Sequence, residues 1–221
     1  MNASAGFPID LILFGMIAAF LVLRLRSILG RRTGYERPPQ PYQPMQPNPQ
    51  APVIDAQAEP AASAARQLPD PASPVGQTLA RMPVIDRTFA PPGFLAGAEK
   101  AFTMIVAAFA AGDRVTLRGL LADDTYRAFE TAISAREAAG QSQVSELRGI
   151  QSATIEAAEL RNTVAQITVR FVSDQVSVLR DKDGKEVSGT DAVTELTDIW
   201  TFERDLTAAD PTWRLVAARS A

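Results

Sequence analysis

The chain has 221 residues, of which 46% are hydrophobic, and it contains neither cysteine nor histidine. The missing cysteines exclude disulfides and zinc–thiolate sites, and the missing histidines exclude Ser-His and Cys-His catalysis within this chain. The net charge of −3 is uneven, because residues 1–92 carry 8 basic and 6 acidic side chains whereas residues 93–221 carry 14 and 19. An acidic C-terminal part without a basic stripe argues against nucleic acid as a partner.

The most apolar stretch is the run at 7–25, FPIDLILFGMIAAFLVLRL, and it predicts a single transmembrane anchor. At about 1.5 Å per residue this run spans about 28 Å, close to the thickness of a bilayer's hydrocarbon core. Its only charges, Asp10 and Arg24, lie near its ends. A cleaved signal sequence and a buried soluble helix are the alternatives, but a signal sequence needs a basic segment before the run and small residues after it.

A basic juxtamembrane segment at 26–33 follows the run instead. Together with the end of the run it supplies four arginines that are expected to face the membrane surface: Arg24, Arg26, Arg31 and Arg32. Because basic flanks stay on the cytoplasmic or matrix side, the N-terminus is expected outside and the rest of the chain inside.

The segment at 34–92 predicts a disordered, Pro-rich tether, since it holds 14 of the 16 prolines and shows no helical or strand periodicity. A spacer is the favoured interpretation, and a ligand for Pro-binding modules is the alternative. One more apolar piece within it, at 82–89, is a candidate for docking on the folded domain.

Residues 93–221 are long enough for one hydrophobic core and too short for two. Phe94, Phe102 and Phe109 recur at helical spacing, and Gly112-Asp113 is typical of a helix end followed by the cap of a new helix. A short second helix is expected through residues 115–121. A third, capped by Asp123, is expected to end near Gly140.

From residue 144 the hydrophobic period changes to two, which predicts strands. About five antiparallel strands are expected, and they lie around residues 144–157, 165–171, 176–180, 195–204 and 213–218. Asp181 to Lys185 indicates a hairpin turn. DKDG resembles the start of a calcium loop, but Ala192 stands where the loop needs Glu, so no metal site is expected. Three helices followed by an antiparallel sheet predict an α+β fold with the helices on one face of a curved sheet.

Four blocks in this order resemble the Tim44-like domain family: FLAGAEKAFTMIVAAFAAGD, LRGLLADDTYRAFETAI, ITVRFVSDQ and DIWTFERDLTAADPTWRLVA. The resemblance covers residues 93–221. It implies the cone-shaped nuclear-transport-factor-two-like fold, in which three helices are wrapped by a strongly bent antiparallel sheet.

The mitochondrial member of this family anchors the import motor at the inner membrane through a long charged N-terminal region. This chain has an anchor and a Pro-rich tether there, so chaperone recruitment is not carried over. It is more similar to the bacterial, TimA-type form, which implies a single-pass inner-membrane protein whose C-terminal domain is cytoplasmic.

The expected function is binding: a membrane-anchored adaptor for protein translocation or membrane-protein assembly, with a protein partner, the bilayer and a bound lipid as candidate partners. No cofactor is expected. Eight large side chains are candidates for lining a ligand pocket, although each could instead fill the core: Phe102, Phe109, Tyr126, Phe129, Val169, Phe171, Trp200 and Trp213.

Primary lipid binding is the main alternative, and an enzyme of the isomerase or hydratase type is the weaker one. Strand alternation turns Glu203 away from Trp200 and Phe202, so Asp198 is the one candidate acid or base for such an enzyme. No catalytic residue is assigned. The acidic residues Asp198, Glu203 and Asp205 are expected to pair across strands with Arg170, Arg204 or Arg214.

Overall fold

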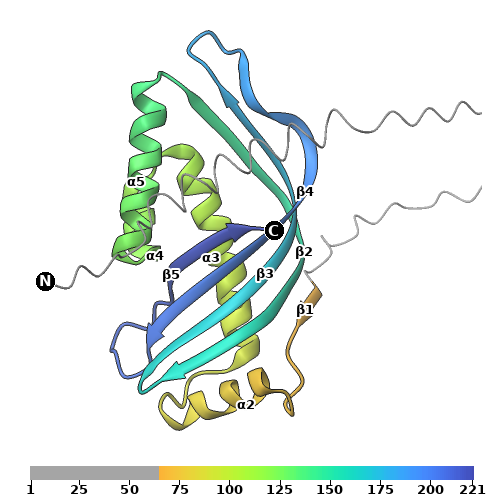
Figure 1. The fold of residues 1–221 in the computed structure, drawn as a ribbon, viewed down its shortest axis with the longest axis vertical. Helices are drawn as coiled ribbons and strands as arrows, with labels where there is room; N and C mark the ends of the chain where they lie inside the picture. Colours follow the sequence, from red (N-terminus) through yellow and green to blue (C-terminus); the bar gives the residue numbers. More distant parts are fainter. Residues whose placement is uncertain (1–64) are drawn as a thin grey trace, which may run out of the picture.

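The computed structural model describes residues 65–221, which form one α+β unit (Figure 1). Its N-terminal half is mainly helical, in the order β1 (Ala65–Gln67), α2 (Pro74–Arg81), the 3₁₀ helix η1 (Met82–Val84), α3 (Pro91–Ala111), α4 (Arg114–Leu120) and α5 (Asp123–Ala138). Its C-terminal half consists of β2 (Ser142–Arg161), β3 (Val164–Arg180), β4 (Glu186–Asp205) and β5 (Arg214–Ser220). The expected fold class is confirmed.

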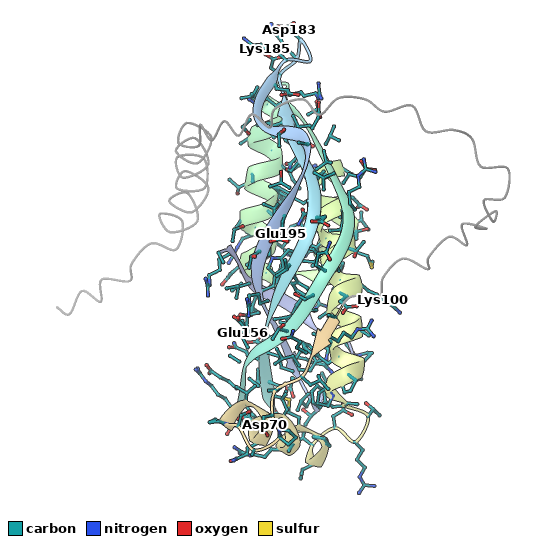
Figure 2. All side chains as sticks on the ribbon, turned by 90° about the vertical axis from the view of Figure 1, so that its right-hand side faces the viewer. Asp70, Lys100, Glu156, Asp183, Lys185 and Glu195 are labelled. Carbon is teal, nitrogen blue, oxygen red and sulfur yellow. The ribbon has the colours of Figure 1, made fainter. Side chains whose placement is uncertain are left out.

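The strands form one sheet in the order β1-β2-β3-β4-β5, and β2 to β5 are antiparallel to their neighbours. The sheet bends around α3, which lies on its concave face with α4 and α5 (Figure 1). Figure 2 looks onto the convex face, where the exposed carboxylates of Glu156 on β2 and Glu195 on β4 point outward. The concave face is therefore the one that builds the core.

Two features of the sheet differ from the prediction. The expected strands at 165–171 and 176–180 are one strand, β3. The polar residues between them do not break it, because Ser173 and Gln175 are buried and the Gln175 side chain donates a hydrogen bond to Ser173 Oγ at 2.9 Å. The sheet also gains β1, which pairs with β2 in parallel and so makes the sheet mixed.

The ends of the helices are set by capping residues that can be recognised in the sequence. Gly112 ends α3 with φ of +71°, and the next residue, Asp113, accepts hydrogen bonds from the backbone N–H groups of Val115 and Thr116 at 3.1 Å to start α4. The third helix differs from the prediction by one residue, because Ala122 is its N-cap. Asp123 lies in its first turn, where a negative charge is also favourable.

The folded unit begins earlier than residue 93, where the tether was predicted to give way to the domain. The side chains of Leu79, Met82 and Phe89 are buried in the core, as the apolar character of 82–89 indicated. The prolines that suggested a tether have a second role here, because Pro74 and Pro91 are the first residues of α2 and α3. Proline is favoured at that position, since its missing N–H has no partner there in any helix.

The predicted anchor at 7–25, the basic segment at 26–33 with its four arginines, and the tether up to residue 64 lie outside the described residues. Within 65–221 one helix, α3, is long and apolar enough to cross a membrane. One side of it packs on the sheet, and 39% of its most apolar 18-residue stretch is buried. Such a helix is equally compatible with the core of a soluble domain and with contact to a membrane.

Candidate binding groove

The centre of the fold is filled by aromatic rings. Phe102 on α3 stacks on Phe171 with ring centroids 4.5 Å apart, and it also meets Trp200 at 4.6 Å. All three side chains are buried. A cavity was predicted between these residues, but their rings meet directly, so they act as core.

The other five predicted pocket residues are divided between three places. Val169 is fully buried in the core. Phe109 and Phe129 meet at 5.0 Å between α3 and α5, and Tyr126 on α5 lies under the guanidinium of Arg118 at 4.7 Å. Trp213, just before β5, is the one member of the set that borders a groove beside α3. Among the described residues most of the eight candidates therefore fill the core, the alternative left open for each of them, because strand and helix periodicity indicates which residues face inward but not whether a space remains between them.

The groove has a volume of about 360 Å³ and runs beside the N-terminal half of α3. Its lining combines aromatic rings, small residues and two cations: Thr88, Phe89, Ala90, Gly93, Phe94, Gly97, Ala98, Lys100, Ala101, Met104, Leu120, Phe202, Arg204, Pro211, Thr212 and Trp213. It opens to solvent, and the Met104 side chain beside it is 48% exposed.

One wall of the groove is aromatic and rigid. The Trp213 ring lies 4.8 Å from Phe94 and 5.9 Å from Phe89, measured between ring centroids. The backbone of α3 also lines the groove, and Gly93 and Gly97 leave open space there, since a methyl group built on either would meet no atom within 4 Å. A ligand backbone or an apolar side chain can approach the helix closely there.

The two cations differ in environment. Lys100 is exposed and makes no ion pair with any residue of 65–221. Arg204 has a side chain only 11% exposed and pairs with Asp86, its Nη1 lying 3.0 Å from Asp86 Oδ2, while its Nε has no hydrogen-bond partner among the described residues. The pKa of Asp86 is lowered, first by the hydrogen bonds that its carboxylate accepts from Thr88 and then by Arg204. The groove thus offers an apolar surface with positive charge at its border.

A second polar feature lies on the concave face beyond the aromatic rings. Asp198 accepts hydrogen bonds from Ser220 Oγ at 3.0 Å and from Gln175 Nε2 at 3.5 Å. Burial raises the pKa of this carboxyl, and the two hydrogen bonds oppose that effect. Asp198 is on the Trp200 side of β4, as strand alternation predicted.

The cross-strand ion pairs that were predicted differ in the structure. Arg170 pairs with Glu156, Arg204 with Asp86 and Arg214 with Asp210. The carboxylates of Glu203 and Asp205 accept hydrogen bonds from Gln166 and Thr207. Within residues 65–221 no group of three or more acidic side chains is arranged to hold a metal ion.

Most residues that line the groove do not form a pattern in the sequence that would predict a binding surface. Gly93, Gly97 and Lys100 are small or singly charged, and none of them contributes to a hydrophobic stripe. The sequence signal that does indicate a further contact surface is the apolar composition of α3, which has only two charged residues although one side alone faces the sheet.

Helices on the concave face of a bent sheet define a domain of the α+β class, and this one carries an open apolar groove beside α3. The sequence profile of the Tim44-like domain matches residues 75–220, and the chain therefore belongs to the Tim44-like family. The match also begins within the predicted tether, in agreement with the earlier start of the fold.

Solved structures resemble the unit only distantly. The intermembrane-space region of the chloroplast protein ARC6 is 12% identical, with 57% of this chain and 95% of that chain covered and a TM-score of 0.42. A conserved protein from Planctomyces limnophilus is 15% identical, with 55% and 90% covered and a TM-score of 0.33. A putative dehydratase of the NTF2-like family from Streptomyces avermitilis is 13% identical, with 59% and 97% covered and a TM-score of 0.35. A search of curated protein sequences finds no match to this chain.

Proposed function

We propose that this protein is a membrane-anchored adaptor that binds an apolar segment of a partner protein in the α3 groove, during protein translocation or membrane-protein assembly. The observation that supports this most is α3, a 21-residue helix that contains only two charged residues and is less than half buried. A helix that is apolar on all sides is favoured where both sides are covered. The sheet covers one side, and a partner segment in the groove would cover part of the other.

Membership of the Tim44-like family supports a membrane-associated role in protein interaction. The apolar run at 7–25 supplies the anchor in this proposal, and the arginines after it hold the C-terminal domain on the cytoplasmic side of a bacterial inner membrane. Protease added to intact spheroplasts tests this topology. The domain should be protected until the membrane is opened, and digestion in intact spheroplasts would contradict the orientation.

Photocrosslinking in membranes tests the binding role. A photoreactive residue at Gly97 or Met104, in the groove, should capture a discrete protein partner, and only when the chain carries its anchor. The matched control is Val187, a similarly exposed apolar residue on the β3–β4 hairpin (50% exposed, against 48% for Met104). Capture of the same products at Val187 would contradict the groove as the binding surface, and adducts of lipid alone would favour lipid binding as the primary activity.

The proposed role is binding without catalysis. Asp198 is the one carboxyl with a raised pKa among the described residues, and its oxygens accept hydrogen bonds from Ser220 and Gln175. These hydrogen bonds give the buried carboxylate a structural role, because they satisfy its oxygens within the fold. If Asp198→Asn abolished function in cells while the folded domain and partner capture stayed intact, a catalytic role would replace this interpretation.

A further inference from the structure

A tetrapeptide occurs twice in this chain, and one copy is docked on the fold. Pro-Val-Ile-Asp stands at residues 52–55 and again at residues 83–86. In the second copy the Ile85 side chain packs against the core, Val84 is 84% exposed, and Asp86 pairs with Arg204 at 3.0 Å. The fold therefore already binds this combination of an apolar side chain followed by a carboxylate.

The α3 groove offers matching chemistry for another such segment. Phe94 and Trp213 form its aromatic wall, and its border carries Lys100, which makes no ion pair within residues 65–221, whereas the charge of Arg204 is already paired with Asp86. An occupant that is apolar with one or two carboxylates fits this surface, since a cation near an apolar groove favours an acidic ligand. A second copy of the α3 face would bring Lys100 against another lysine, which disfavours self-association through this surface.

A short stretch of the chain before residue 65 has this composition, and the described residues begin in β1, which contacts α3 at the residue next to Lys100. Residues 52–59, PVIDAQAE, contain Val53, Ile54, Asp55 and Glu59 and no basic residue. The chain enters the fold in β1 beside α3, where Arg66 Nη2 lies 2.8 Å from Glu99 Oε2, and Glu99 precedes Lys100. In Figure 2, Lys100 lies at the level of β1.

The connection is long enough. Asp55 lies ten residue steps before Ala65, and an extended chain spans up to about 3.3 Å per step, or about 33 Å. Crossing the outer face of α3 requires roughly the diameter of a helix, about 10 Å. Asp55 can therefore reach Lys100 without disturbing β1.

We propose that residues 52–59 fold back into the α3 groove and occupy it when no partner is bound, with Val53 and Ile54 on the aromatic wall and Asp55 beside Lys100. This self-docking rests on the proposed function, because it regulates access to the same surface. A partner segment must then displace residues 52–59 from the groove, so that only a segment of higher affinity binds there.

Disulfide trapping in the full-length protein in membranes tests the proposal, and it is unambiguous because the chain has no cysteine of its own. The test pair is Ile54→Cys with Met104→Cys, and the control pair is Ile54→Cys with Val187→Cys on the far hairpin. Under mild oxidation the test pair should form an intramolecular disulfide at least tenfold faster than the control pair. Asp55→Lys should slow it, Lys100→Glu should slow it, and the two changes together should restore it.

Equal rates for the test and control pairs would overturn the proposal, and so would a disulfide that joins two chains. Charge changes without effect on the rate would overturn the pairing of Asp55 with Lys100. Photocrosslinking of a partner at Gly97 and Met104 is an independent measurement. Capture there without a fast intramolecular disulfide would leave the adaptor function standing and remove only the self-docking.

Discussion

The Asp86–Arg204 pair joins the N-terminal segment to the sheet through a contact of opposite charges. Both side chains are nearly buried, with 9% of Asp86 and 11% of Arg204 exposed. Removing one partner of a buried pair leaves the other charge without compensation, which typically costs about 3–5 kcal/mol.

Asp86→Ala should therefore lower the free energy of unfolding of the full-length protein by about 3 kcal/mol, measured by urea denaturation with tryptophan fluorescence. The control is Glu159→Ala, which removes the partner of Arg161 in a pair whose side chains are 57% and 80% exposed. Such exposed pairs contribute less than about 1 kcal/mol. If the two variants lost similar amounts of unfolding free energy, the buried charge of Arg204 would not need Asp86 for its stabilisation.

The pKa of Asp198 is raised by burial in the folded state, whereas the pKa of Asp86 is lowered. The effect of Asp198 on stability therefore has the opposite pH dependence. A carboxyl with a raised folded pKa favours the folded state most when it is protonated. Its contribution is thus complete below the ordinary carboxyl pKa and is lost as the pH rises through the raised value.

Asp198→Asn should remove this pH dependence. The variant should be more stable than the unchanged protein at pH 7, and the difference should shrink as the pH falls towards 4. Thermal unfolding at a series of pH values measures it. A stability difference that stays constant across this range would mean that Asp198 does not titrate differently in the folded and unfolded states.

At the scale of elements, two glycines with different environments make a matched test. Gly189 in β4 has φ of +89°, and a methyl group there would lie 2.1 Å from the carbonyl oxygen of Ser177. Gly97 in α3 has open space around it. Alanine at Gly189 should be strained, whereas alanine at Gly97 should favour the helix.

Gly189→Ala should therefore destabilise the protein by about 2 kcal/mol, and Gly97→Ala should stabilise it by about 0.5–1 kcal/mol. Thermal melts followed by circular dichroism check both signs. A stabilised Gly189→Ala variant would show that the turn of β4 relaxes, and a destabilised Gly97→Ala variant would show that the groove wall is closer to other atoms than the structure places it.

The elements that the sequence predicted are those with a clear period. Phe94, Phe102 and Phe109 repeat at helical spacing, and the strands from residue 165 onward alternate, so their packing faces followed directly. β1 has no such signal, because Ala65, Arg66 and Gln67 are all exposed and form only a three-residue strand. Its place beside β2 depends on tertiary contacts, among them the pair of Arg66 with Glu99.

The candidate site was predictable only in part for a related reason. Trp213 was named, but Arg204 was expected to pair across the sheet, and its actual partner, Asp86, lies in a segment whose prolines indicated disorder. Composition averaged over 34–92 concealed the helices α2 and η1 and the buried side chains of Leu79, Met82 and Phe89. Pro74, Pro83 and Pro91 belong to helices, and a count of prolines does not distinguish such positions from prolines outside helices.

At the scale of the whole molecule, the segment 65–92 is part of the folded unit and closes one end of the core. Leu79, Met82 and Phe89 are at most 7% exposed. Burying a large apolar side chain contributes about 1.5–3 kcal/mol, so these three together contribute roughly 6 kcal/mol. This is comparable with the whole stability of a typical domain, about 5–15 kcal/mol.

A chain that begins at residue 93, where composition alone places the start of the domain, should therefore unfold or aggregate. A chain that begins at residue 65 keeps these three side chains and Asp86, and it should melt cooperatively at nearly the temperature of the full-length protein. Circular dichroism melts of the two truncated chains beside the full chain make the comparison. Equal melting temperatures for the chains starting at 65 and 93 would show that the N-terminal segment only rests on the domain. A loss confined to the shorter chain would show that residues 65–92, through Leu79, Met82, Phe89 and Asp86, are required for the stability of the core.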